Sequence, residues 1–141
     1  MKKVTFSTQD HAQHIIDNCI VIDTETTGLN DDDIAIELAA VDAKTGTTII
    51  DTLIHCDWGE IPEAAYKVHG IGIEDLKTAP RAASVIAQLT NAASNNEKHL
   101  TAFNTHFDNR MLMQTAAANE LCNERIEHAM AAHCCVMELA N

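Results

Sequence analysis

A run of four apolar residues at 19–22 ends in two closely spaced carboxylates. Asp23 and Glu25 follow the run directly, and Gly28 comes soon after them. A short apolar run that is bounded by turn residues predicts a buried strand, and such strands occupy the centre of a sheet. Open α/β sheets bind ligands at the carboxyl ends of their strands. The pattern therefore predicts an α/β fold with a candidate site where this first strand ends.

The spacing of the two acids indicates the chemistry of that site. Side chains at positions i and i+2 of a strand point to the same face, so Asp23 and Glu25 are expected to lie together. Two carboxylates held this close repel each other unless a cation lies between them. Hard divalent cations take oxygen ligands of this kind. We therefore predict a metal site that contains Asp23 and Glu25.

Composition limits how the protein can meet its partners. The 141 residues fit one domain, and the formal net charge is −12. A surface this acidic does not attract a polyanion, so any contact with nucleic acid must be local. The five cysteines form no Cys-x-x-Cys pair, which is typical of reduced thiols in an intracellular, cytoplasmic protein. No membrane span or signal peptide is expected.

Periodicity along the chain predicts alternating strands and helices. Residues 1–18 are expected to form a helical extension before the first strand. Further strands are predicted over 34–41, 47–55 and 99–103, with a fifth at 134–137, and helices over 62–70, 81–94 and 105–120. Pro62 is expected at the first position of its helix and Gly70 at the end of it, and the next helix is expected to bury Val85, Ile86 and Leu89. A meander of three strands followed by helix and strand units indicates a mixed α/β sheet with helices on its faces. We expect one such domain over residues 1–141.

A third carboxylate, Asp108, falls in the first turn of the helix predicted after the fourth strand. If that strand pairs beside the first strand, Asp108 lies at the same sheet edge as Asp23 and Glu25. Three carboxylates are enough to hold one divalent ion and part of a second. A pair of metal ions stabilises both the attacking and the leaving oxygen in phosphoryl transfer. Bound cations would also reconcile a phosphodiester substrate with an acidic protein.

Three segments of the chain together resemble the DEDD 3′–5′ exonuclease superfamily, which includes DnaQ-like proofreading subunits and RNase T-like ribonucleases. The segments are Asp23-x-Glu25-Thr26-Thr27-Gly28, Val68-His69-Gly70-Ile71 and Asn104-x-x-Phe107-Asp108. The resemblance runs from residue 19 to the end of the chain. It implies a ribonuclease H-like fold and an enzyme that hydrolyses terminal phosphodiesters of DNA or RNA with two divalent ions, Mg²⁺ or Mn²⁺.

The resemblance also implies roles for particular residues. Asp23, Glu25 and Asp108 would be the catalytic metal ligands. The residues that would contact the 3′-terminal nucleotide are Thr26, Thr27, Gly28, His69, Asn104 and Phe107. Simpler explanations remain open for some of these residues. His69 can interact with the dipole at the end of its helix, Phe107 can be a core residue, and Asn104 can cap the next helix.

One motif of the superfamily is missing from the sequence. The commoner branch carries a later His-x-x-x-x-Asp motif, which supplies the general base and a fourth carboxylate. No such motif follows Asp108 before Asn141, so we expect a fold that lacks the C-terminal part of the family domain. Without its general base, the site is expected to catalyse the reaction roughly 10²–10⁴-fold more slowly. An uncovered sheet face also predicts a homodimer or a partner that covers it.

Two other functions fit parts of the pattern. The missing motif favours a non-catalytic, nuclease-like module that binds nucleic-acid ends or a protein partner. The pattern Asp-x-Glu-x-Thr at 23–27 also suggests a phosphatase of the haloacid dehalogenase type, although that chemistry requires a second Asp and Glu25 fits it poorly. The acidic run at 31–33 suggests a calcium loop, but without spaced ligands it is more typical of a solvated turn.

Overall fold

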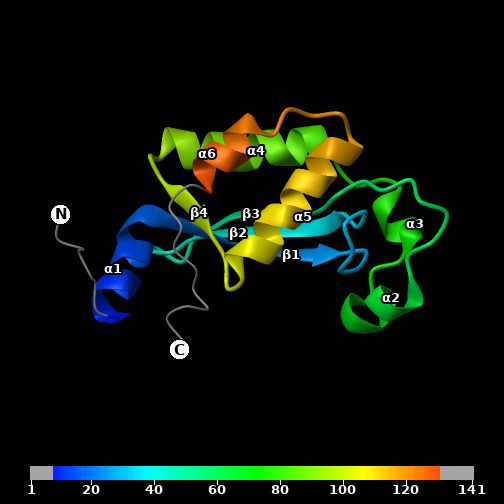
Figure 1. Ribbon diagram of the computed structural model, residues 1–141, viewed down its shortest axis with the longest axis horizontal. Coiled ribbons are helices and arrows are strands. Elements are labelled where there is room, and N and C mark those ends of the chain that lie inside the picture. Colours follow the sequence, from blue (N-terminus) through cyan, green and yellow to red (C-terminus); the bar gives the residue numbers. More distant parts are fainter. Residues whose placement is uncertain (1–7, 131–141) are drawn as a thin grey trace.

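The computed structural model describes residues 8–130, and in this range four strands form one sheet in the order β3-β2-β1-β4 (Figure 1). In chain order the elements are α1 (Thr8–Asn18), β1 (Cys19–Thr26), β2 (Ala35–Asp42), β3 (Thr48–Leu53), α2 (Glu63–His69), α3 (Ile73–Leu76), α4 (Ala82–Asn95), β4 (His99–Thr101), α5 (Thr105–Ala118) and α6 (Glu124–Ala129).

Strand pairing confirms the mixed sheet predicted from the sequence. β1 pairs antiparallel with β2, and β2 pairs antiparallel with β3, which completes the meander. β4 lies parallel to β1 through three residue pairs, the last of which is Val21 with Thr101. This pairing places the start of α5 at the carboxyl end of β1, as expected. The fifth strand predicted at 134–137 lies outside the described residues.

One face of the sheet packs against three helices. Ile20 and Ile22 of β1 are buried in the main hydrophobic core together with Val85 and Leu89 of α4 and Leu112 of α5. Figure 1 shows α4, α5 and α6 gathered over this face. Because side chains alternate along a strand, Asp23 and Glu25 point to the opposite face, where Asp23 is exposed. The first strand is therefore central in the sheet, but only one of its faces is fully buried.

The two ends of α2 (Glu63–His69) lie close to the proline and the glycine that marked them in the sequence. α2 ends at Gly70, which adopts a left-handed conformation at φ 70° and donates its N–H to the Tyr66 carbonyl at 2.7 Å. Pro62 lies at the N-cap position of α2, one residue before the first helical position expected for it. No helix of the described range is long and apolar enough to cross a membrane.

Two short helices were not predicted from the sequence. α3 is one turn long and is anchored by Leu76, which is fully buried in a second, smaller core with Ile36 and Ile71. α6 packs on α4 and α5 through Ile126. Helices this short carry little periodicity, and tertiary contacts determine where they form.

Candidate active site

The carboxyl end of β1 carries a concentration of negative charge. Glu25 of β1 lies directly opposite Glu37 of β2 in the antiparallel ladder, so both side chains point to the face that carries Asp23. Burial raises the pKa of Glu37, and the negative charge of Glu25 raises it further. The electrostatic repulsion among these acids is the kind of strain that a bound cation relieves.

Asp108 reaches the same region from the helix side of the sheet. It lies in the first turn of α5, where it is only 6% exposed, and its Oδ1 accepts a hydrogen bond of 2.7 Å from the Thr24 hydroxyl. Asn104 caps this helix, because its side chain accepts a hydrogen bond from the Phe107 N–H at 3.3 Å. Burial raises the pKa of Asp108, the Thr24 hydrogen bond opposes that shift, and the nearby charge of Asp23 adds to it.

The three predicted acids therefore gather at one edge of the sheet, but they do not share one point. Asp108 contacts Thr24, whose side chain lies on the helix-covered face of β1, whereas Asp23 and Glu25 point to the other face. Within residues 8–130, no three His, Cys, Asp or Glu side chains lie close enough to hold a metal ion as they stand. The order of strands and helices in the sequence predicted that the three acids lie at one sheet edge. It did not predict the hydrogen bond between Asp108 and Thr24.

We expect Asp108→Asn to stabilise the isolated protein at neutral pH by on the order of 1 kcal/mol. Because the folded-state pKa of Asp108 lies above its ordinary value of 3.8, folding favours the protonated carboxyl. Stability is therefore lost as the pH rises through 3.8 and the folded-state pKa. Asparagine removes the charge and its oxygen can still accept from Thr24.

Urea unfolding at pH 3 and at pH 7 measures this effect. The advantage of Asp108→Asn over the parent should be larger at pH 7, while the exposed control Asp57→Asn should show little change at either pH. An equal advantage at both pH values would contradict the assignment of the effect to the buried charge.

The loop that follows β1 is fixed by a buried carboxylate. Asp33 is 6% exposed, and its two oxygens accept hydrogen bonds from the Thr27 hydroxyl at 2.7 Å and from the Asn30 N–H at 2.8 Å. Gly28 packs so closely on Asp33 that a Cβ on Gly28 would lie 2.9 Å from the Asp33 Cγ. The acidic run at 31–33 is therefore not a solvated turn throughout, because its last residue is buried. The sequence interpretation was wrong for Asp33.

A cleft of about 650 Å³ lies between this loop, α2 and the start of α5. Five of the six predicted nucleotide contacts line it, namely Thr26, Thr27, Gly28, His69 and Phe107. Asn104, the sixth, is not among the lining residues and serves as the cap of α5. Leu29 and Val68, which are 73% and 80% exposed, add apolar surface to the cleft walls.

Hydrogen bonds hold the predicted contact residues in place. The His69 ring accepts a hydrogen bond from the Ile71 N–H at Nδ1, which leaves Nε2 to donate to the Thr26 carbonyl at 3.0 Å. The Thr26 hydroxyl donates to the Gly28 carbonyl, and the Thr27 hydroxyl is bound to Asp33. His69 thus links α2 to the end of β1 and forms part of the cleft wall. Both threonine hydroxyl protons are already used within the protein.

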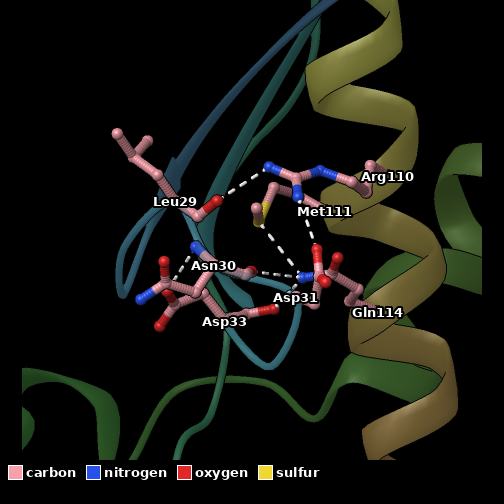
Figure 2. A network of polar contacts seen from close by, with 7 residues as sticks. All are labelled: Leu29, Asn30, Asp31, Asp33, Arg110, Met111 and Gln114. Atoms are coloured by element: carbon pink, nitrogen blue, oxygen red, sulfur yellow. Dashed lines mark hydrogen bonds and ion pairs between the residues drawn. The ribbon is translucent and has the colours of Figure 1, made fainter.

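Two further residues at this site had no signal in the sequence. Arg110 and Gln114 of α5 bind the loop that carries Leu29 and Asp33 (Figure 2). Their spacing of four residues places them on one face of a helix, but it does not indicate what that face contacts. A partner some 80 positions away is visible only in the folded structure.

A mixed sheet whose central strand ends in carboxylates beside a cleft defines a protein of the ribonuclease H-like fold. The chain matches the RNase T-type exonuclease family over residues 20–141, and it belongs to that family. The resemblance recognised in the sequence is therefore confirmed.

The chain is also similar to three known proteins, one by sequence and two by fold. An exonuclease of Escherichia phage 186, CP81, which is described as uncharacterized, is 33% identical over 108 residues; the match covers 77% of this chain and 54% of that protein. Among solved structures, E. coli Exonuclease I with a dT13 oligonucleotide superposes with a TM-score of 0.64 at 15% identity, covering 78% of this chain and 25% of the other. A zinc-bound complex of E. coli Exonuclease I with single-stranded DNA gives a TM-score of 0.65 at 15% identity; the match covers 80% of this chain and 26% of the other. The chain thus spans about half of the phage relative.

Proposed function

We propose that this chain is a metal-dependent 3′–5′ exonuclease domain that removes terminal nucleotides from DNA or RNA. The observation that carries the proposal is the position of Asp23, Glu25 and Asp108 at one sheet edge, beside a cleft of about 650 Å³. Ligand pockets of this size accommodate small molecules of nucleotide dimensions. Membership of the exonuclease family and the oligonucleotide in the related Exonuclease I complex support the same substrate class.

The donor set at the sheet edge fits hard divalent cations such as Mg²⁺ or Mn²⁺. All three proposed ligands are carboxylates, and oxygen ligands are the ones these ions prefer. Asp108 has to move relative to Asp23 and Glu25 for all three to share a cation, because no three such side chains of the described residues lie close enough to hold one. When bound, divalent ions would neutralise phosphate charge and activate water. Two such ions are expected from the family.

The cleft residues would position the terminal nucleotide. The half-buried Phe107 ring and the exposed Leu29 and Val68 side chains offer apolar surface to the base and sugar. The hydroxyl protons of Thr26 and Thr27 are engaged, so these residues would meet the substrate through other groups, including the backbone around Gly28. His69 would act as a fixed wall, because its contacts occupy both ring nitrogens.

Release of mononucleotides from a labelled single strand tests the proposed activity. The labelled 5′ end should persist on products that shorten one nucleotide at a time, and only when Mg²⁺ or Mn²⁺ is present. Internal cleavage, or shortening from the 5′ end, would contradict the proposal.

Divalent ions should also raise the thermal midpoint of the protein. An ion at about 100 times its dissociation constant stabilises the folded state by about 2.7 kcal/mol. We expect Mn²⁺ to raise the midpoint by several degrees. The Asp23→Ala, Glu25→Ala double variant should lose this response, whereas Asp57→Ala, Glu60→Ala, which removes the same charge from exposed positions, should keep it. A response that persists in the first variant would place the ion elsewhere.

A second candidate function is a non-catalytic module that binds nucleic-acid ends. Two observations favour it. Asp108 accepts a hydrogen bond from Thr24, and no three acidic side chains of the described residues lie close enough to share a metal ion. Calorimetry separates the two functions: oligonucleotide binding without release of mononucleotides would favour the module. A homodimer, or a partner that covers the sheet, remains a prediction from the sequence, and light scattering that shows a monomer would contradict the dimer.

A further inference from the structure

The loop at 29–33 is held against α5 by two side chains of that helix. Arg110 donates from Nη2 to the Leu29 carbonyl at 2.8 Å and from Nη1 to Asp31 Oδ1 at 3.0 Å. Gln114 donates from Nε2 to the carbonyls of Asn30 at 3.0 Å and Asp33 at 2.7 Å. Figure 2 shows both side chains leaving the helix toward the loop. We call this set of contacts the loop clamp.

The loop clamp joins the two sides of the cleft. Arg110 lies three residues after Phe107 on the same face of α5, and its guanidinium carbon is 5.9 Å from the centre of the Phe107 ring. Phe107 and Leu29 both line the cleft. One side chain therefore contacts a cleft residue of the helix and the backbone of a cleft residue in the loop. The helix that carries it also carries Asp108.

Packing does not fix Leu29, and this makes the Arg110 contact important. The Leu29 side chain is 73% exposed, so few neighbours restrain it. Asp33, at the other end of the loop, is buried and hydrogen-bonded to Thr27. The ion pair with Asp31 adds little, because the Asp31 side chain is 99% exposed and surface pairs contribute weakly. The hydrogen bond from Arg110 thus restrains Leu29 directly, whereas Asp33 and Gln114 hold the loop from Asn30 onward.

We propose that Arg110 is a positioning residue for the terminal nucleotide, and that Gln114 assists it. Arg110 sets the separation between Leu29 and Phe107, and so determines how tightly the cleft holds the 3′ end. The proposal rests on the function proposed above. Because the guanidinium binds the protein rather than the reacting atoms, its removal is expected to weaken substrate binding and to leave the chemical step unchanged.

Steady-state kinetics on a single-stranded oligonucleotide test this role. Arg110→Ala should raise KM about tenfold and leave kcat within about twofold. Arg110→Lys keeps the charge but can satisfy only part of the clamp, so an intermediate KM is expected. Asp31→Asn should stay close to the parent. The matched control is Arg125→Ala, which removes the same charge from an exposed arginine whose described contact is Asn91 Oδ1 of α4.

Amide hydrogen exchange tests the loop clamp independently of nuclease activity. Arg110→Ala should speed the exchange of amides at 29–33 by about tenfold, and Arg125→Ala should not. If the parent releases no nucleotides, the proposed function fails while the exchange result still supports or overturns the clamp. Equal exchange in both variants, or a KM for Arg110→Ala equal to that of Arg125→Ala, overturns the proposal. A lowered thermal midpoint with unchanged KM would also overturn it, because it indicates a structural role only.

Discussion

The double replacement of Asp23 and Glu25 by alanine should lower nucleotide release by about three orders of magnitude or more. Both side chains lie at the end of β1 on the face opposite the one that packs against α4, α5 and α6, and Asp23 is exposed. Their removal relieves repulsion with Glu37 without opening the core, so the variant should fold and retain at least its parent stability. The expected loss is therefore a loss of metal binding and not of structure.

Two measurements are needed to interpret that loss. Circular dichroism and thermal unfolding should show a folded protein, and calorimetry should show that Mn²⁺ no longer binds. The control, Asp57→Ala with Glu60→Ala, removes two exposed acids and should keep the parent rate. Parent-like nucleotide release by the Asp23, Glu25 variant would remove the assigned site from the mechanism.

Gly28→Ala should destabilise the protein by about 2–4 kcal/mol. The added methyl group would lie 2.9 Å from the Asp33 Cγ and closer still to one of its carboxylate oxygens, Oδ2. Asp33 cannot move aside at little cost, because it is buried and accepts hydrogen bonds from Thr27 and Asn30. Relief of the clash would break at least one charge-assisted hydrogen bond and displace the loop that lines the cleft.

Urea unfolding compares this variant with Gly59→Ala. Gly59 has no atom within 4 Å of the position that a Cβ would take, so its replacement should change stability by only a few tenths of a kcal/mol. Gly28→Ala should also raise the KM for an oligonucleotide, because the loop moves. If the two alanine variants were equally stable, Asp33 would have to be mobile, and the description of a fixed loop would be wrong.

The sequence predicted those parts of the fold that have strong local signals. The apolar run at 19–22 predicted the central strand, and the periodicity of Val85, Ile86 and Leu89 predicted the buried face of α4. Gly70 marked the end of α2 because a left-handed residue closes that helix. Each of these signals depends on neighbours in the chain, and each was confirmed.

Features that depend on distant partners were not predictable. Thr24 and Asp108 form a hydrogen bond across 84 positions. Alternation along the strand indicates that Thr24 faces away from the two acids, but no local pattern indicates that Asp108 will contact it. Asp33 follows two exposed acids, and its burial depends on the close packing of Gly28. In the sequence, Arg110 is indistinguishable from an ordinary surface arginine. Its contact with the Leu29 carbonyl exists only in the folded chain.

The pairing of β1 with β4 has a consequence for how this site forms in time. Three residue pairs join positions 19–21 to positions 99–101, whereas β1, β2 and β3 follow one another as a local meander. Closing so long a loop for so few contacts is slow and easily reversed, so the meander is expected to form first. Partial opening that detaches β4 and α5 would separate Asp108 from Asp23 while the meander persists. The affinity for metal would then depend on how firmly β4 and α5 are docked onto the three-stranded meander.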